Sequence, residues 1–292
     1  MMISRRFGYA FVANQRVGTE AMHLVAGSDA DLAYARIGNH KHDTPDQMAA
    51  FLAERGLDAG FEDLLVFGVV REPAAWLLSW FNSRSRKALA NPAKRNHRNY
   101  TGGHAWAEFL ELARSDDPPL MTKARPQRAF FTASKGGPDV RPVPFDRVNE
   151  VFAKVLPEGS AMHGFRMGDP AHRKNSAKDV RMTMDEMSAE DRRIVNEEIL
   201  PRDYELYLRA RAEADDYPPA VPAAPGELDR RVREEAALDD VAYETAFARA
   251  QSLMFHGAAE ADIRADVARY VHVDADALLA EVAPRVARMS GR

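Results

Sequence analysis

Apolar residues recur along the first two hundred residues in two kinds of segment, continuous runs and helical stripes. Continuous runs at 7–14 and 61–70 contain β-branched and aromatic residues, which predicts buried strands. The second run is the most apolar in the chain, as expected of a central parallel strand covered on both faces. Apolar residues that recur every three or four positions predict helices at 20–26, 45–52, 74–81, 105–113, 125–132, 146–156 and 188–208.

The order of these segments indicates the fold class and the domains. Strands that alternate with helices predict an α/β fold, a three-layer sandwich with a central parallel sheet. Four prolines between residues 217 and 226 prevent regular structure. We therefore expect an α/β domain at 1–214, a proline-rich linker at 215–226 and a helical C-terminal extension at 227–292.

Composition narrows the classes of function. The 292 residues carry a formal charge of −4, whereas a general nucleic-acid binder is usually basic. The chain has no cysteine, which excludes disulfides and thiolate metal sites and fits a reducing compartment. No signal peptide or membrane span is expected from the pattern, and no His or acidic cluster has convincing metal-ligand spacing. These features predict a soluble cytoplasmic protein without a metal.

The turn between the first predicted strand and helix has the composition of an anion site. Residues 14–19 read Asn-Gln-Arg-Val-Gly-Thr. Glycine allows a close approach of the backbone, and the following helix start adds positive potential. Arg16 and Thr19 supply a cation and a hydroxyl. By itself the segment also fits an ordinary strand–helix turn.

A second candidate segment follows the most apolar strand. Arg71 leaves the end of this strand, Pro73 follows, and Ser79 stands eight residues after the arginine on the next helix. Ligands of open parallel sheets bind at the carboxyl ends of the strands, and arginine suits forked contacts with phosphate. Arg71 is therefore placed for a phosphate, and Ser79 can join it if the helix folds back over the strand end.

Together the two segments resemble the sulfotransferases that use 3′-phosphoadenosine-5′-phosphosulfate (PAPS). That family has a 5′-phosphosulfate loop of the form Lys-x-Gly-Thr-Thr and a 3′-phosphate motif, Arg-Asp-Pro with a serine eight residues after the arginine. Weaker similarities in family order are Lys41-His42, Pro126-Gln127-Arg128, the Asn-Ser segment within 172–176, and Asp-Tyr-x-Leu-Tyr at 203–207. The resemblance covers residues 7–210 and leaves the C-terminal extension unexplained.

The resemblance implies a P-loop-like fold, PAPS as sulfuryl donor and 3′-phosphoadenosine-5′-phosphate (PAP) as product. The acceptor would be a hydroxyl or amine of an unidentified small molecule or glycan, and the similarity to carbohydrate-type members favours a carbohydrate or glycolipid. The implied donor-binding residues are Gln15, Arg16, Val17, Gly18, Thr19, Arg71, Ser79, Arg173 and Lys174. The implied catalytic residues are Arg16, His42 and Glu20.

Three positions depart from the family pattern. Arg16 replaces the loop lysine. This change keeps the positive charge but removes a group that can donate a proton, so we expect the rate of transfer to fall more than the affinity for PAPS. Glu20 replaces a threonine or serine, and a carboxylate beside a phosphosulfate would repel it. It can point away along the helix, which we favour, or face the acceptor as a base. Glu72 replaces the aspartate of the second motif, a mild change.

The general base is a choice among three residues. His42 comes first because of its place in the family pattern and because an ordinary histidine titrates near pH 6.5. His40 is second and Glu20 third. A basic set follows the second motif and is either a solvated loop or a flap that meets the 3′-phosphate or an acidic acceptor. Its members are Arg84, Arg86, Lys87, Lys94, Arg95 and Arg98.

Two other functions stay open at this point. A non-catalytic module that binds PAPS or PAP would explain the changes at Arg16 and Glu20. A P-loop nucleotide phosphotransferase would need Gly-x-x-x-x-Gly-Lys-Ser/Thr and a magnesium-binding acid, and neither is found. The amphipathic helices of the extension can dock on the α/β domain, cover the acceptor site or form a homo-oligomer, and such helices most often bury their apolar stripe on the nearest surface.

Overall fold

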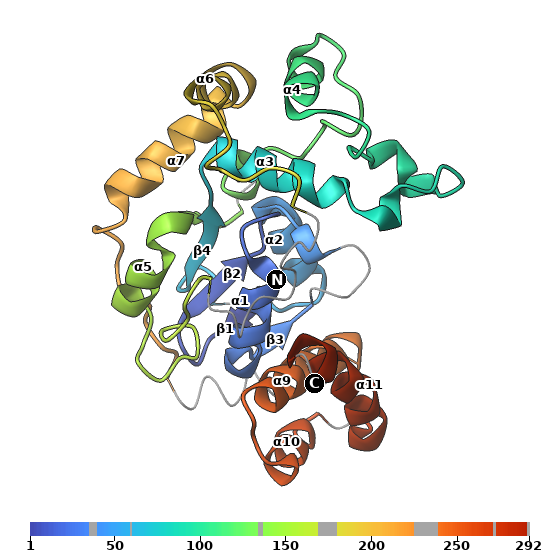
Figure 1. The fold of residues 1–292 in the computed structure, drawn as a ribbon. Coiled ribbons are helices and arrows are strands. Elements are labelled where there is room, and N and C mark those ends of the chain that lie inside the picture. The colour runs from blue at the N-terminus through green and yellow to red at the C-terminus, as the bar shows by residue number, and fades with distance from the viewer. Residues whose placement is uncertain are drawn as a thin grey trace.

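A five-stranded mixed sheet forms the centre of the computed structural model, as Figure 1 shows. The structure describes residues 1–34, 40–58, 60–133, 137–168, 180–224, 239–270 and 273–290. The strands lie in the order β3-β1-β2-β4-β5. Their bounds are β1 (Met2–Ser4), β2 (Tyr9–Val12), β3 (Leu32–Ala33), β4 (Leu65–Val70) and β5 (Arg141–Pro144).

The α/β class is confirmed, but the central sheet, predicted to be parallel, is mixed. Strands β2, β4 and β5 are parallel, whereas β1 is antiparallel to both β2 and β3. The reason is the tight connection between β1 and β2, in which Gly8 has φ 70°. A chain that reverses within four residues can only return antiparallel. The parallel half of the sheet is the half that holds both candidate segments.

Helices fill most of the remaining described chain. A capping box formed by Thr44 and Gln47 starts α2, the helix predicted at 45–52. Within the described residues the helices are α1 (Thr19–Ala26), α2 (Pro45–Glu54), α3 (Pro73–Arg84), α4 (Trp106–Arg114), α5 (Val148–Val155), α6 (Ala189–Arg193), α7 (Pro201–Glu213), α9 (Asp239–Phe255), α10 (Glu260–Val267) and α11 (Ala275–Ser290). None of these helices is both long enough and apolar enough to cross a bilayer.

Three predicted elements differ in detail. The helix expected at 125–132 is only a short 3₁₀ turn, Gln127–Phe130. The helix expected at 188–208 is interrupted by a π-helical stretch, Ile194–Ile199, and a break before Pro201, whose ring cannot continue the preceding helix. The basic set, expected on a loop or flap, begins within α3, which continues to Arg84, and its remaining members lie on a segment with short 3₁₀ turns.

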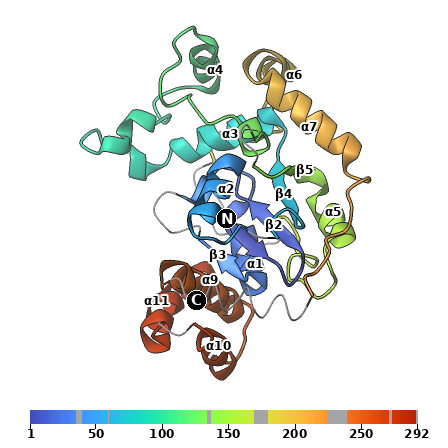
Figure 2. The same ribbon diagram turned by 180° about the vertical axis from the view of Figure 1, so that it is seen from behind.

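The sheet has an apolar cluster on each face, because strand side chains alternate in direction. Tyr9 and Phe11 of β2 belong to one cluster, together with residues of α1, α3 and α5. Ala10 and Val12 belong to the other, together with residues of α2. Figure 2 shows α5 and α7 beside β4 and β5 from behind. Both faces of the sheet therefore carry helices.

The C-terminal extension is helical as predicted over 239–270 and 273–290, and it packs on the α/β domain. Helices α9, α10 and α11 gather beside β3, at the edge away from β5 (Figures 1 and 2). The Arg249 guanidinium is buried, chelates the Asp266 carboxylate at 2.6 and 2.7 Å, and donates to the carbonyls of Ser28 and Ala30, both at 2.8 Å. One side chain thus ties α9 to α10 and to the turn after α1.

The proline-rich segment lacks regular structure over 215–224, as predicted, but it lies against the domain. The N–H of Ala220 donates to Val155 O at 2.7 Å, and the N–H of Ala223 donates to Arg5 O at 2.9 Å. The apolar positions Val241, Phe247 and Ile263 of the extension are buried within the chain. Because these side chains are already buried, they do not support a homo-oligomer through these helices, which stays a prediction.

Candidate functional site

The carboxyl ends of β2 and β4 are joined by buried amide side chains. Asn14 Nδ2, just after β2, donates to Val69 O of β4 at 3.0 Å and to Gln127 Oε1 at 3.2 Å. Gln127 Oε1 also accepts from the Arg71 N–H at 2.9 Å, and its Nε2 donates to Arg71 O at 2.7 Å. Gln127 is fully buried. The two strand ends that carry the candidate segments are therefore locked side by side.

Gln127 is itself fixed by Asp203 at the third residue of α7. The buried Asp203 carboxylate accepts from the backbone N–H groups of Gln127 at 2.8 Å and Arg128 at 3.2 Å. Burial raises the pKa of Asp203 above its ordinary value, and these hydrogen bonds oppose the rise. Both residues lie in segments noted only for family resemblance. Nothing in their local pattern indicates that they support the site.

The turn after β2 has the backbone of an anion nest. Arg16 and Gly18 have φ of 62° and 79°, and Val17 between them is buried in the core. Alternating right- and left-handed residues point backbone N–H groups toward one place. Gly18 is also the N-cap of α1 and offers no side-chain cap, so the first N–H groups of the helix are left to other acceptors. Trp76 Nε1 holds the turn by donating to Gln15 O at 2.7 Å.

The decisive contact joins the two candidate segments directly. The guanidinium of Arg16 donates to Ser79 Oγ from Nε at 3.2 Å and from Nη2 at 3.0 Å. Arg16 comes from the turn after β2, and Ser79 comes from α3, which follows β4. The two segments therefore converge on one place, as the sequence predicts.

Comparisons of the chain with protein-family models, with curated proteins and with solved structures find no match. What the site can do therefore has to be inferred from its own side chains.

Arginines surround the point where the segments meet. Burial, followed by the like charges of Arg86, Arg71 and Arg84, lowers the pKa of Arg16 to about 10. Burial likewise lowers the pKa of Arg71 and Arg84. Among the described residues, no carboxylate forms an ion pair with any of these four side chains within 4.0 Å. An anion bound here would relieve both the burial and the mutual repulsion of the guanidinium groups.

Two acidic residues that could weaken an anion site are neutralised elsewhere. Glu20 is ion-paired with Lys41. Glu72 accepts from Arg192 at 2.5 and 2.7 Å and from Asn196 at 2.9 Å, on the side of α6. The carboxylate that Glu20 adds beside the turn is therefore neutralised, and Lys41 is the residue that neutralises it.

The side chains of some predicted binding residues have structural roles or are buried. The Thr19 hydroxyl donates to Asn14 O and so fastens the turn. The buried Val17 side chain can offer a ligand only its backbone. Arg84 lies over the Trp80 ring at 4.1 Å and belongs to the arginine group with Arg86. Arg173 and Lys174, two predicted donor contacts, lie outside the described residues.

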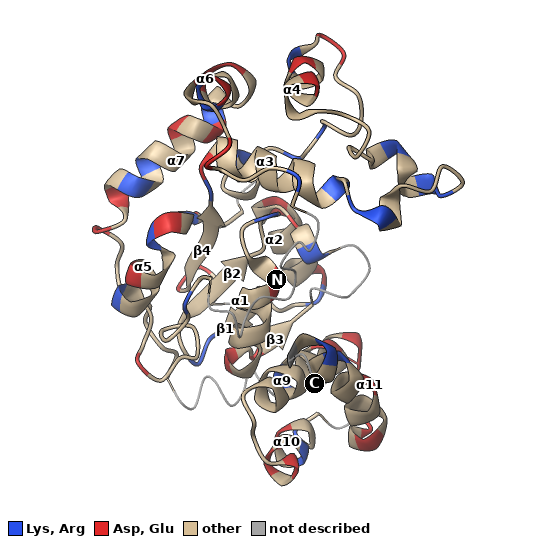
Figure 3. Cartoon of the chain, in the orientation of Figure 1, with Lys and Arg blue, Asp and Glu red and all other residues tan. Residues whose placement is uncertain are grey.

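The rest of the basic set extends away from the site. Lys87, Lys94, Arg95 and Arg98 are exposed on the segment between α3 and α4, where Figure 3 shows blue residues and no red ones. The sequence has no Asp or Glu from residue 73 to residue 107. The basic set therefore divides, with Arg84 and Arg86 at the site and the others beyond it.

His42 lies at the start of the anion turn. Its Nδ1 is 2.7 Å from Ala13 O, the residue after β2, and its own carbonyl accepts from Arg125 Nη1 at 2.9 Å. A carbonyl oxygen only accepts, so Nδ1 carries the proton and Nε2 of the neutral ring is a proton acceptor. His40, the second candidate base, instead has its Nδ1 2.8 Å from Asp43 Oδ2.

Two apolar side chains cover the site, and the sequence gives no sign of either. A Cβ on Gly18 would come within 2.8 Å of Met167 Sδ and 2.9 Å of Met167 Cε. The Arg71 guanidinium lies over the Phe145 ring at 4.9 Å. Met167 is held by its N–H, which donates to Asn149 Oδ1 at 2.7 Å.

Gly18→Ala is expected to destabilise the protein by about 1–2 kcal/mol from backbone strain alone, and to displace Met167 as well. Gly56 is a matched control because its φ is 66° but a Cβ there meets nothing within 4 Å. Urea unfolding should therefore show a larger loss for Gly18→Ala than for Gly56→Ala. Only Gly18→Ala should weaken binding of inorganic pyrophosphate. Equal effects of the two variants would show that the close approach of Met167 is unimportant.

Proposed function

We propose that this chain is a PAPS-dependent sulfotransferase. The observation that carries the proposal is the contact between Arg16 and Ser79, because it brings a turn suited to phosphosulfate together with a motif suited to a second phosphate. PAPS is a ligand with two such anionic groups at the ends of one nucleoside. Arg16, Arg71, Arg84 and Arg86, which have no carboxylate partner in the part of the chain that the structure describes, supply the charge that these groups need.

Each group of the donor has a natural place in this arrangement. The 5′-phosphosulfate would bind at residues 15–19, where the nest and the start of α1 favour an anion. The 3′-phosphate would bind to Arg71 and to Ser79, whose oxygen accepts from Arg16 and whose own O–H remains to donate to a phosphate oxygen. Gln127 fixes the backbone of Arg71 and so orients its side chain at the strand end.

The reaction needs alignment, charge stabilisation and one proton transfer. The acceptor oxygen or nitrogen forms a bond to sulfur while the bond from sulfur to the 5′-phosphate oxygen breaks, and PAP leaves. Arg16 and the start of α1 stabilise the charge that develops on the departing phosphate. The acceptor proton goes to Nε2 of His42, which lies beside the turn.

Further parts of the proposal follow from the same features. We assign the α/β domain to a P-loop-like three-layer arrangement, because helices cover both faces of the sheet and the anion turn joins β2 to α1. We place the protein in the cytoplasm, because a chain without cysteine fits a reducing compartment. The acceptor is a small molecule or glycan.

Calorimetric titration with PAP tests the proposal. The protein should bind PAP without magnesium, and Arg71→Ala should weaken binding roughly tenfold to a hundredfold, since a hydrogen bond to a charged group contributes about 1.5–3 kcal/mol. Arg202→Ala is the control, because Arg202 is exposed on α7.

Three outcomes would contradict the assignment. The absence of heat with PAP would remove the nucleotide site altogether. Stabilisation by ATP and magnesium in place of PAP would indicate a phosphotransferase. PAP binding without any release or transfer of labelled sulfate from PAPS would indicate a non-catalytic binding protein.

A further inference from the structure

The connection between α3 and α4, residues 85–105, presents exposed cations and contains no acidic residue. The sequence has 44 Asp and Glu in 292 residues, so about five would be expected between residues 73 and 107, and none is found there. Figure 3 shows the α3–α4 connection with blue residues and no red ones. Since the whole chain is negative, this surface differs in charge from the rest of the protein. Its exposed cations are Arg86, Lys87, Lys94, Arg95 and Arg98.

The backbone of the α3–α4 connection is fixed by hydrogen bonds. Thr101 Oγ1 donates to Phe81 O of α3 at 2.8 Å, and Thr101 O accepts from Arg181 Nη1 at 3.1 Å. His97 Nδ1, which is 2.9 Å from Leu89 O, joins the two 3₁₀ turns of the connection. The cations on these turns are therefore displayed on a built surface, and their mutual repulsion is unfavourable until an anion binds.

Most of these cations are available to a partner from outside the chain. Within the part of the chain that the structure describes, no hydrogen bond or ion pair is formed by the side chains of Lys87, Lys94, Arg95 and Arg98. Only small ions of the solvent neutralise these charges, and an anionic ligand can replace such ions.

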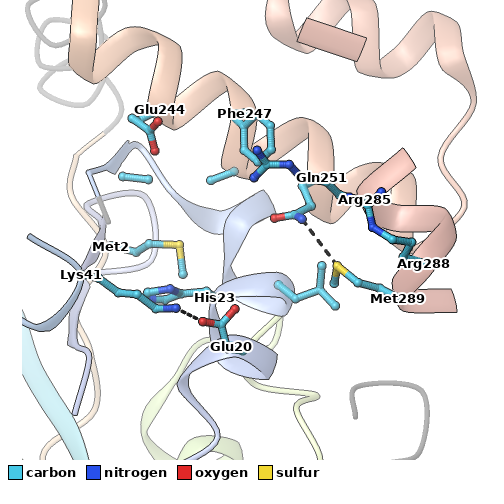
Figure 4. A pocket seen from close by; sticks show the side chains of 13 residues that line it. Met2, Glu20, His23, Lys41, Glu244, Phe247, Gln251, Arg285, Arg288 and Met289 are labelled. Carbon is cyan, nitrogen blue, oxygen red and sulfur yellow. Dashed lines mark hydrogen bonds and ion pairs between the residues drawn. The ribbon is translucent and has the colours of Figure 1, made fainter. Parts of the chain in front are cut away.

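The cavity of about 690 Å³ between the α/β domain and the C-terminal helices, which Figure 4 shows from close by, differs in this respect. In its wall Glu20 is ion-paired with Lys41, and Arg285 is ion-paired with Glu281 at 2.7 Å. These charges are neutralised within the chain. Of the two places, the α3–α4 connection is therefore the one that calls for an anionic ligand.

The positive charge of the connection continues into the proposed donor site. Ser79 and Ser83 are spaced i, i+4 and so share one face of α3. Ser79 Oγ accepts from Arg16, and Ser83 O accepts from Arg86 Nε at 2.7 Å. Among the like charges that lower the pKa of Arg16, that of Arg86 has the largest effect, as expected of a close neighbour. Arg86 thus lies where the donor site and the connection meet.

The spacing of the cations along the connection indicates a ligand with many charges. Arg86 and Lys87 belong to the end at the donor site, whereas Arg95 and Arg98 belong to the second 3₁₀ turn. A ligand that meets both ends needs several anionic groups in series. A polymer has this property, and a molecule with a single anionic group does not.

The other exposed side chains of the connection limit the kind of polymer. A protein partner usually needs an apolar or aromatic centre, and single-stranded nucleic acid needs aromatic rings on which its bases stack. The large apolar side chains that are exposed within the described residues lie on other segments. His97 and Tyr100 are half-buried and stack on each other, with ring centroids 5.7 Å apart. The exposed amides of Asn91 and Asn96 instead suit a ligand rich in hydroxyl groups.

We propose that the α3–α4 connection binds an acidic polysaccharide, and that this polysaccharide is the acceptor of the sulfuryl group. Its acid groups pair with the cations of the connection, and one of its hydroxyl groups lies at the donor site. This inference names the class of acceptor and therefore rests on the proposed function. The hydroxyl oxygen bonds to sulfur while the bond from sulfur to the 5′-phosphate oxygen breaks, the proton goes to Nε2 of His42, and PAP leaves.

The test compares two oligosaccharides that differ only in charge. The protein saturated with PAP is titrated with octagalacturonate and with its methyl ester, in which the carboxylates are masked. Octagalacturonate should bind at least about tenfold more tightly than the ester and than galacturonate, the single sugar. Raising the salt concentration should weaken its binding. Labelled sulfate from PAPS should appear on octagalacturonate.

Two triple variants that remove the same charge locate the binding surface. The first, Lys94→Gln with Arg95→Gln and Arg98→Gln, should weaken binding of octagalacturonate about tenfold and leave the affinity for PAP unchanged. The matched control replaces three exposed arginines on other helices with glutamine and should preserve both affinities. These arginines are Arg202, Arg209 and Arg288.

Several results would overturn this inference. They are equal affinities for octagalacturonate and its ester, equal losses in the two triple variants, and tighter binding of octaglutamate or of a thymidine oligonucleotide than of octagalacturonate. Binding of both PAP and octagalacturonate without transfer of sulfate would refute the acceptor class. A PAP titration on the same sample separates the two proposals. If PAP fails to bind, the sulfotransferase assignment fails, and titration of octagalacturonate alone still tests the surface.

Discussion

Replacing His42 with glutamine should lower kcat for sulfuryl transfer by about 10²–10⁴-fold, the range typical for loss of a general base. Nδ1 of His42 is held by Ala13 O at 2.7 Å, which leaves Nε2 to take the acceptor proton. Glutamine keeps a hydrogen-bonding side chain of similar length but cannot act as a base. PAP affinity should stay the same, because His42 is not among the groups assigned to the phosphates.

The pH dependence of kcat provides a second measurement of the role of His42. Burial lowers the pKa of His42 below its ordinary value of 6.5, with the hydrogen bond to Ala13 opposing the shift and the charge of Lys41 adding to it. A base is active in its neutral form, so a lowered pKa extends activity to lower pH. The acid limb of kcat should therefore have its midpoint below pH 6.5, and His42→Gln should abolish that limb.

His163→Gln is the control for this variant, since His163 is half-buried like His42. It should leave both kcat and the pH profile unchanged. If His42→Gln retains the rate and the acid limb, the base is another residue, and Glu20 or His40 becomes the next to test.

Replacing Arg249 with methionine should destabilise the protein by about 3–5 kcal/mol, the usual result of removing one partner from a buried ion pair. The Arg249 side chain has 5% of its surface exposed, and its partner Asp266 has 11%. Methionine would leave the Asp266 carboxylate uncompensated and the carbonyls of Ser28 and Ala30 without their donor. Urea unfolding followed by circular dichroism measures the loss.

A surface arginine in the same extension provides the comparison. Arg264 is ion-paired with Glu260 at 2.8 Å and Asp276 at 2.7 Å, but these groups are exposed. Surface pairs contribute little to stability, so Arg264→Met should leave the midpoint of unfolding nearly unchanged. Similar losses in the two variants would mean that Arg249 does not anchor the extension. Combining Arg249→Met with Asp266→Leu should recover part of the stability, because no buried charge then remains.

The strands that carry the site could be predicted, whereas the edges of the sheet could not. Strands β2 and β4 are continuous apolar runs, and the pattern alone locates them. Strands β1 and β3 have only three and two residues, too few to show a period. Strand β5 contains Pro142 and Pro144, which argue against a strand because proline cannot donate to the ladder, yet an edge position tolerates them.

The same division holds for the candidate site. Arg16 and Ser79 could be paired from the sequence because each follows one of two strands expected to be parallel. Gln127 and Met167 could not, because their roles depend on packing between segments far apart in the chain. Whether the paired residues bind PAPS stays a prediction.

The hydrogen bond between α9 and β3 has a consequence for how the protein is made. Strand β3 is the edge of the sheet, and the N–H of Ala33 donates to Thr245 Oγ1 at 2.9 Å. An uncovered edge strand is a template for pairing with another chain. During translation this edge is synthesised about two hundred residues before its cover, so the nascent chain must remain unassociated until α9 has emerged from the ribosome.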